Sequence, residues 1–214
     1  MAPRARHESG PDPVFIGGRL WLDFINTDDA RLGVRVDTIA AFEPFVRWLA
    51  AARVIDSERA DALLRRAAEQ PSGATAALVE TRRVRAALRA LVERGRGETA
   101  ERVREAALAE INRILGRSVG TRRVESRTDG GYVRSFVPVG DVFGGLVIPV
   151  VESAVDSLVN DELSRIHRCS DRRCPRYFID LTRSHTRRWC DMRTCGNRAK
   201  AQRSREQGRR PSRA

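Results

Sequence analysis

The sequence predicts a mainly helical domain with one small antiparallel sheet, followed by a short cysteine-rich module. Three observations lead to this prediction. Apolar residues recur three and four positions apart over most of the chain before residue 160, which is the period of an amphipathic helix. One stretch around residue 130 is instead rich in Val, Thr, Tyr and Phe, as strands are. All four cysteines lie between positions 169 and 195.

Five helices follow from the apolar spacing and from residues that begin or end helices. We expect them from Thr38 to about Leu49, from an Asp56 cap to near Pro71, from about Ala74 to Arg94, from about Glu98 to Leu115, and through Val147 to Leu158. On the third helix, Arg82, Arg85 and Arg89 fall on the side opposite the apolar stripe. We interpret them as a solvated face paired with nearby glutamates.

Two segments of this domain do not follow the helical period. Thr121–Arg127 and Tyr132–Val139 flank Asp129-Gly130-Gly131, which predicts a β-hairpin. Phe15–Thr27 is strongly apolar, and its composition does not decide between strand and helix. Asp23 and Asn26 within it either bind a ligand or satisfy backbone groups at a turn or cap, and we favour the second interpretation.

The helical domain contains no cluster of acid–base or nucleophilic side chains, so we do not expect an enzyme. Residues 1–14 are rich in Pro, Arg and Gly, which predicts a disordered tail. This stretch does not contain the apolar segment that a secretory signal needs. The longest apolar run, Phe143–Val151, is broken by glycine and proline and is far shorter than the ~20 residues that cross a bilayer. We therefore expect a soluble, cytoplasmic protein.

The positive charge is concentrated at the C-terminal end. The chain carries a formal charge of +12, and only Lys200 among its 40 basic residues is a lysine. Residues 168–214 hold 15 basic and four acidic side chains, a net +11, whereas the preceding 167 residues contribute +1. A general bias toward arginine would enrich both parts without this asymmetry, so the segment that holds the cysteines is expected to bind an acidic partner.

The cysteines follow the pattern Cys169-x4-Cys174-x15-Cys190-x4-Cys195. Two close pairs suit a tetrahedral ion bound by four thiolates, and sulfur ligands favour zinc or an iron–sulfur cluster. Four ligands leave no open position, so the site is expected to be structural. Disulfides are disfavoured in a cytosolic chain, and a redox switch that releases zinc is a weaker alternative. His167 or His185 is a possible replacement for one cysteine.

The spacer between the pairs predicts the architecture of the module. Arg176–Leu181 and Thr186–Cys190 are strand-like and Thr182–His185 suits a turn, so we expect a hairpin, and a helix follows Cys195. Ligand pair, hairpin, ligand pair and helix is the plan of a treble-clef zinc finger. That helix has almost no apolar face. The candidate nucleic-acid contacts are Arg187, Arg188, Arg193, Asn197, Arg198, Lys200, Arg203 and Arg205, with Asn197 also a candidate brace of the ligand turn.

Residues 189–200, WCDMRTCGNRAK, resemble the signature of the CGNR zinc finger family, and Cys169-x4-Cys174 followed by Tyr177–Asp180 is similar to its first half. Gly17–Leu20 with Leu22–Thr27 (LDFINT) resembles the opening of the ABATE domain that occurs with this finger. The resemblance implies a bacterial, stress-induced transcription regulator, with zinc on Cys169, Cys174, Cys190 and Cys195.

These observations give a two-domain hypothesis. Residues 1–14 and 208–214 are tails. Residues 15–163 form an ABATE-like domain that senses a small-molecule effector, forms a homodimer or contacts another protein. Residues 164–207 form a CGNR-type finger that binds DNA. The alternatives are an RNA- or ribosome-binding zinc protein, and a finger that docks on a protein.

Overall fold

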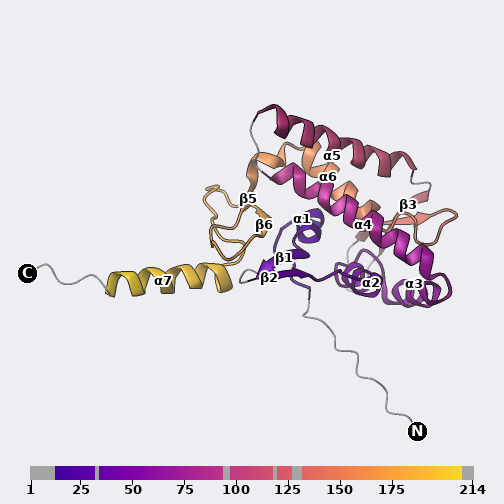
Figure 1. The fold of residues 1–214 in the computed structure, drawn as a ribbon, viewed down its shortest axis with the longest axis horizontal. Coiled ribbons are helices and arrows are strands. Elements are labelled where there is room, and N and C mark those ends of the chain that lie inside the picture. The colour runs from indigo at the N-terminus through magenta and orange to yellow at the C-terminus, as the bar shows by residue number, and fades with distance from the viewer. Residues whose placement is uncertain (1–12, 32–33, 94–96, 118–119, 127–131, 209–214) are drawn as a thin grey trace, which may run out of the picture.

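The computed structural model describes residues 13–31, 34–93, 97–117, 120–126 and 132–208. Over these residues the chain is mainly helical and carries three two-stranded antiparallel sheets (Figure 1). The predicted fold class is confirmed, whereas the treble-clef detail stays a prediction. Most of the predicted tails at 1–14 and 208–214, and the turn at 129–131, lie outside the described residues. None of the helices described is both long and apolar enough to cross a bilayer.

The helices are α1 (Leu20–Ile25), α2 (Phe42–Ala51), α3 (Ser57–Glu69), α4 (Pro71–Val92), α5 (Glu98–Arg117), α6 (Ile148–Val159) and α7 (Asn197–Gly208). The strands pair as β1 (Asp28–Arg31) with β2 (Val34–Asp37), β3 (Gly120–Ser126) with β4 (Tyr132–Pro138), and β5 (Ile166–Arg168) with β6 (Tyr177–Ile179). A 3₁₀ turn, η1 (Glu162–Arg165), precedes β5, and a π-helical turn, η2 (Met192–Gly196), precedes α7.

Helix α1 lies at the centre of the core, and it shows that Leu20–Ile25 of the undecided segment Phe15–Thr27 is helical. It packs against α4, α6 and β6. Trp21 is fully buried, and its indole Nε1 donates to Ser157 Oγ on α6 at 3.0 Å, which satisfies the polar atom of this ring. The long helices α4 and α5 run against each other above this centre (Figure 1).

Helices α2 to α6 confirm the predicted periodicity, with Phe45, Leu49 and Leu88 fully buried. Asp56 caps α3 as expected, its carboxylate accepting from Arg59 N at 2.7 Å. The β3–β4 hairpin is confirmed as well. The β1–β2 hairpin was not predicted, because five of its eight residues are charged and its alternation of apolar and charged residues is confined to the four residues of β2.

The predicted hairpin within the finger is half wrong. Strand β6 falls within Arg176–Leu181, but Thr186–Cys190 forms no strand, and β6 pairs with β5 from before the first cysteine. Side chains replace strand pairing in the second segment, since Arg187 N donates to Asp180 Oδ2 at 2.8 Å. The predicted helix after Cys195 is confirmed as α7.

The finger and the helical domain share a core. Tyr177 and Ile179 of β6 belong to the main apolar cluster, and Ile16 packs against the cysteines. Asn26 is buried and makes two hydrogen bonds to the backbone of Tyr177, donating to its carbonyl at 2.8 Å and accepting from its N–H at 2.9 Å. Asp23 accepts from the N–H groups of Ile16 and Gly17, both at 2.7 Å. The interpretation of Asp23 and Asn26 as partners of backbone groups is therefore confirmed.

The interpretation of the α4 arginines as a solvated face was wrong for two of the three. Arg85 is 4% exposed and forms a two-bond ion pair with Asp37, not with a glutamate. Arg89 donates to the backbone carbonyls of Ile25 and Asp28. The unpredicted β1–β2 hairpin covers this side of α4, and that is why the helix period alone assigned the arginines to solvent.

Candidate metal centre and basic surface

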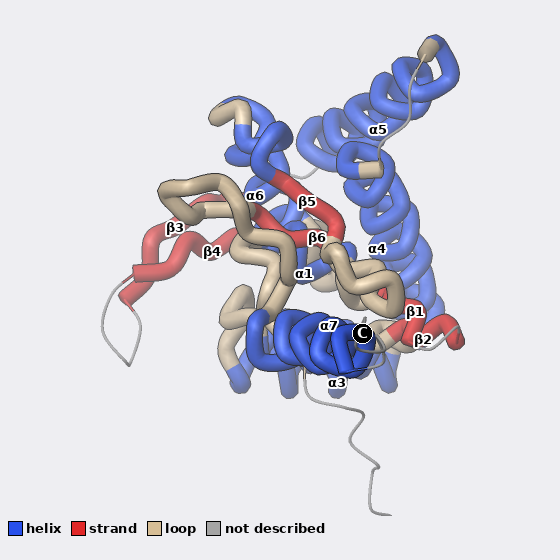
Figure 2. The backbone as a smooth tube through the Cα atoms, turned by 90° about the vertical axis from the view of Figure 1, so that its left-hand side faces the viewer, coloured by secondary structure: helices blue, strands red, loops and turns tan. Residues whose placement is uncertain are grey.

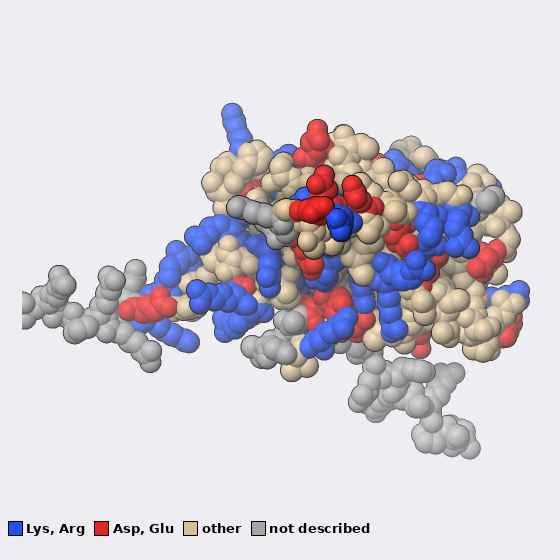
Figure 3. All heavy atoms as spheres, turned by 45° about the horizontal axis from the view of Figure 1, so that its top comes forward, with Lys and Arg blue, Asp and Glu red and all other residues tan. Residues whose placement is uncertain are grey.

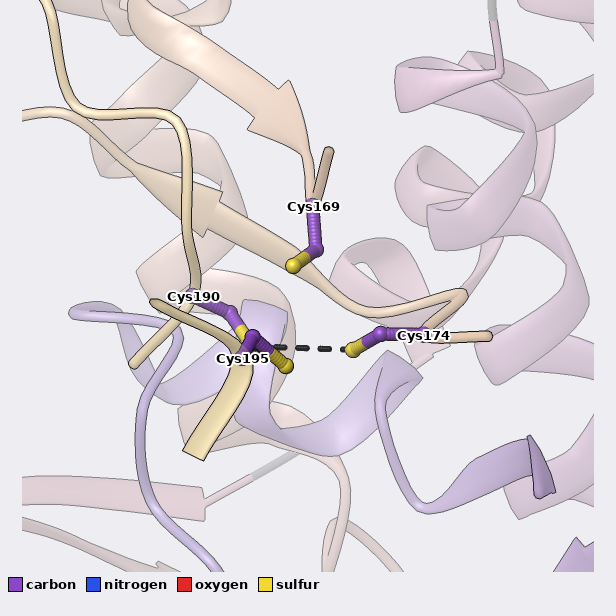
Figure 4. Close-up of side chains that lie close together, drawn as sticks. All are labelled: Cys169, Cys174, Cys190 and Cys195. Carbon is purple, nitrogen blue, oxygen red and sulfur yellow. Dashed lines mark hydrogen bonds between the residues drawn. The ribbon is translucent and has the colours of Figure 1, made fainter. Parts of the chain in front are cut away.

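The structure brings the four cysteines together in one buried cluster at the finger (Figure 4). Cys169 follows β5, Cys174 ends the turn after it, Cys190 ends the spacer, and Cys195 lies in η2. Cys169 N donates to the Arg176 carbonyl at 2.9 Å, which closes the first ligand loop. The thiols therefore come from two short loops that the backbone holds face to face.

The sulfur positions fit a tetrahedral ion. The sulfurs lie within 4.8 Å of one another, with 3.6 Å between Cys174 Sγ and Cys190 Sγ and 3.7 Å between Cys190 Sγ and Cys195 Sγ. A tetrahedral zinc ion with four Zn–S bonds of about 2.3 Å separates its ligand sulfurs by about 3.8 Å. All four cysteines are free, so no disulfide competes for them. His167 and His185 are not part of this cluster.

Three of the thiols interact strongly with one another. Hydrogen bonds from Cys174 and Cys190 lower the pKa of Cys169, whereas bonding to Cys169 raises the pKa of Cys174 and of Cys190. One thiolate in this buried cluster thus opposes the ionisation of its neighbours. A divalent cation supplies the missing positive charge and allows all four sulfurs to bind as thiolates. The closed four-sulfur shell suits a structural role.

The residues Cys195-Gly196-Asn197-Arg198 all serve the second ligand turn. A Cβ on Gly196 would lie 2.7 Å from Met192 Sδ, so any larger residue there requires the exposed Met192 side chain to move. Asn197 Nδ2 donates to the Arg193 carbonyl at 3.0 Å, which braces the turn. Arg198 donates to Cys195 Sγ at 3.0 Å and to Asp171 Oδ2 at 2.8 Å, and so connects the second ligand turn to the first.

Arg187 is likewise held inside the finger. Its guanidinium donates to the carbonyls of Trp189 and Cys190 and lies 4.5 Å from the centre of the Phe178 ring. Asp180 fixes the other end of this loop. Its carboxylate accepts from the Thr182 hydroxyl and N–H and from Arg187 N, and these bonds lower the pKa of Asp180 to about 2. Periodicity and composition gave no signal for this role of Asp180.

The remaining predicted contact residues point into solvent. Arg188, Arg193, Lys200, Arg203 and Arg205 are exposed, as are Asn197 and Arg198 of the ligand turn. Helix α7 projects from the body of the molecule (Figure 1), and Figure 2 looks along it. Basic side chains gather around α7 and the finger, whereas acidic and basic ones are interspersed over much of the remaining visible surface (Figure 3).

A groove of about 710 Å³ separates the first ligand loop from α7. Arg188 and Arg203 line it together with Arg172 and Arg173, which the sequence analysis did not single out. Arg188 lies 5.3 Å from the centre of the Trp189 ring, also in the groove. The local charge around the first cysteine pair was the available signal for Arg172 and Arg173. The groove thus extends the basic surface from α7 onto the metal-binding loop.

Comparison with known families agrees with this architecture. The ABATE family, described as a "Putative stress-induced transcription regulator", matches residues 18–161, and the CGNR zinc finger matches residues 165–208. Among curated proteins, none matches the chain. Both families are of regulatory or zinc-finger type rather than enzymatic, and the finger match with its four buried cysteines supports zinc as the cofactor. The chain therefore belongs to the ABATE family and ends in a CGNR zinc finger.

Proposed function

We propose that this zinc-binding regulator is a DNA-binding transcription regulator that works in the cytoplasm. Zinc on Cys169, Cys174, Cys190 and Cys195 holds the finger at 164–207, and the finger contacts DNA. The helical domain at 15–163 senses a small ligand or contacts a protein, including a second copy of this chain. The observation that carries the proposal is α7, a polar helix that projects from the body and carries exposed basic residues.

The packing of α7 supports nucleic acid over a protein partner. Helix α7 has 12 residues, all of those described being polar or alanine except Gly208, and its main contact is with η2. A helix that is polar all round is solvated or bound to a polar partner. About 18 Å of helix at 1.5 Å per residue suits the major groove of DNA.

We divide the eight predicted contacts by their hydrogen bonds. Arg187, Asn197 and Arg198 position the ligand loops, and the other five side chains bind phosphates, namely those of Arg188, Arg193, Lys200, Arg203 and Arg205. Arg172 and Arg173 extend this set along the groove. The bracing interpretation of Asn197 is supported by its bond to the Arg193 carbonyl.

The test is competitive binding of the zinc-loaded full chain to mixed-sequence duplex DNA and to single-stranded RNA of equal length, between 50 and 200 mM salt. The variant Lys200→Gln, Arg203→Gln, Arg205→Gln should bind duplex DNA at least tenfold more weakly, with a salt slope lower by about three. Its matched control, Arg102→Gln, Arg104→Gln, Arg117→Gln, removes the same charge from exposed positions on α5 and should bind as the wild type does.

Each other outcome overturns the proposal. Preference for RNA would assign the finger to RNA or ribosome binding, and equal loss in both variants would mean nonspecific attraction by net charge. If the wild type binds neither nucleic acid more tightly than the α7 variant does, the finger docks on a protein instead. Zinc content and circular dichroism verify that both variants are folded.

A further inference from the structure

A second basic site lies on the helical domain, and none of its lining residues also lines the groove of the finger. A pocket of about 550 Å³ separates one face of α4 from the β1–β2 hairpin. Its charged lining consists of Arg35, Arg82, Arg85, Arg89, Asp28 and Asp37. Three of the arginines occupy one face of α4, because they are spaced three and four residues apart. Neither the metal centre nor the DNA-binding proposal uses this pocket.

The lining carries more positive than negative charge. Arg85 pairs with Asp37 and Arg35 pairs with Asp28, each through two hydrogen bonds of 2.6–2.8 Å, so these four charges balance. Over the part of the chain that the structure describes, Arg82 and Arg89 donate to backbone carbonyls and not to carboxylates. The four arginines and two aspartates leave the pocket with two excess positive charges, although Arg89 also lies close enough to Asp28 to help lower the pKa of that carboxyl.

The floor of the pocket is rigidly built. Arg85 is buried and also donates to Thr27 Oγ1 at 2.8 Å. Burying an arginine is costly unless its donors are paired, so a helix face that only needed solubility would leave such residues in water. A planar guanidinium is also the side chain best suited to bind two oxygens of one carboxylate or phosphate.

Residues 26–29 connect this pocket to the finger. Thr27 and Asp28 bond to the arginines of the pocket. Their neighbours bond to the finger, since Asn26 pairs with Tyr177 and Asp29 Oδ2 accepts from Arg176 Nε at 2.9 Å. Consecutive residues of one short segment thus face the pocket and the zinc module, so a shift of the segment at one site displaces contacts at the other.

We propose that this pocket binds a small oxyanion, a ligand bearing carboxylate or phosphate groups, between Arg82 and Arg89, and that residues 26–29 transmit its binding to the finger. The inference gives the ligand-sensing role of the helical domain a site and a chemical class. It rests on the proposed function only for the effect on DNA, because anion binding is measured separately.

Calorimetric titration of the zinc-loaded full chain with inorganic phosphate, sulfate and succinate tests the site. At least one anion should bind, and Arg82→Gln and Arg89→Gln should each weaken it at least tenfold. Arg83→Gln is the matched control, because Arg83 is the exposed neighbour on α4 that pairs with Glu110 on α5. Arg82 is exposed, so its variant stays informative if Arg89→Gln fails to fold.

Phosphate also suits the finger, so the triple α7 variant should retain anion binding. Binding that is lost in the α7 variant and kept in Arg82→Gln would place the anion on the finger and overturn the inference, as would no binding of any of the three anions. For the coupling, a saturating anion at constant ionic strength should change DNA affinity at least fivefold in the wild type and not in Arg82→Gln. Anion binding that leaves the DNA affinity unchanged would overturn the proposed transmission through residues 26–29. A chain that binds the anion but no DNA would instead refute the proposed function.

Discussion

Replacing Asn26 with alanine should weaken the helical domain and the finger together. The Asn26 side chain is the partner of both the N–H and the carbonyl of Tyr177, in the middle of the shared core. Alanine removes both partners at a site that bulk water reaches poorly, because Asn26 is only 8% exposed. Tyr177 would then carry two unpaired backbone groups in an apolar environment.

The magnitude follows from these two groups. Each buried backbone group that loses its partner costs about 1–3 kcal/mol, so Asn26→Ala, which affects two groups, should lower the free energy of unfolding by about 2–6 kcal/mol. In a chain of this size 1 kcal/mol changes Tm by about 2–4 °C, which gives a decrease of at least about 4 °C. Strand β6 lies between the two ligand pairs, so zinc should also bind at least tenfold more weakly.

Thermal unfolding by calorimetry and competition with a zinc-binding dye measure the two effects on the zinc-loaded chain. Asn160→Ala is the matched control. Asn160 also donates to a backbone carbonyl, that of Asp156, but it is exposed at the end of α6. Its replacement should change stability by no more than about 0.5 kcal/mol.

Two results would refute the reasoning. The first is an Asn26→Ala variant whose Tm lies within about 1–2 °C of the wild type, which corresponds to less than about 1 kcal/mol. The hydrogen bonds to Tyr177 would then make no net contribution to the free energy of unfolding. If Tm decreases but zinc affinity does not, the finger holds its metal independently of the helical domain, and the shared core does not couple them.

Three further predictions concern the metal loop, pH and zinc. Arg187→Ala should lower the free energy of unfolding by about 2–3 kcal/mol, because carbonyls of the ligand loop lose their donor. Arg188→Ala should leave stability nearly unchanged and weaken DNA binding. Equal losses of stability for the two variants in denaturant titrations would contradict the role of Arg187. Burial, opposed by backbone hydrogen bonds, raises the pKa of Asp23 from its ordinary 3.8 to about 6. The free energy of unfolding of the wild type should therefore decrease by up to about 3 kcal/mol relative to that of Asp23→Asn as pH rises from about 4 to about 6. A difference in stability between the two proteins that stays constant with pH would contradict the raised pKa. Removing zinc with a chelator should lower the Tm of the whole chain in one transition, because Tyr177 and Ile179 belong to the main core; two separate calorimetric transitions would show independent modules.

Local signals in the sequence sufficed for most helices and for the metal centre. Apolar spacing predicts a buried stripe wherever one side of a helix meets the core, as Phe45 and Leu49 do. Cysteine spacing predicts the ligand set because the chemistry of four thiolates restricts which residues take part. Asp56 shows the same locality, since its cap bond reaches only three residues along the chain.

The errors came from contacts between distant segments. Strand β6 pairs with β5, and no local pattern distinguishes that partner from Thr186–Cys190. Arg85 has the spacing of a solvated residue, and its burial depends on Asp37 in a hairpin 48 positions earlier in the chain. The bond from Asn26 to Tyr177 spans 151 positions. Periodicity shows which side of a helix carries the apolar stripe, but it does not show whether a distant segment covers the other side.

The hydrogen bonds of the finger separate the residues that build it from those free to recognise a partner. Gly196, Asn197 and Arg198 act on the second ligand turn, so the family signature encodes the metal-bound conformation. Under the proposed function, recognition of DNA falls to side chains that make none of these bonds, on α7 beyond Arg198 and along the groove at Arg172 and Arg188. Two proteins that share the Cys-Gly-Asn-Arg turn would then fold the same finger and still differ in the DNA sequence they bind, because those exposed side chains can change without disturbing the metal site.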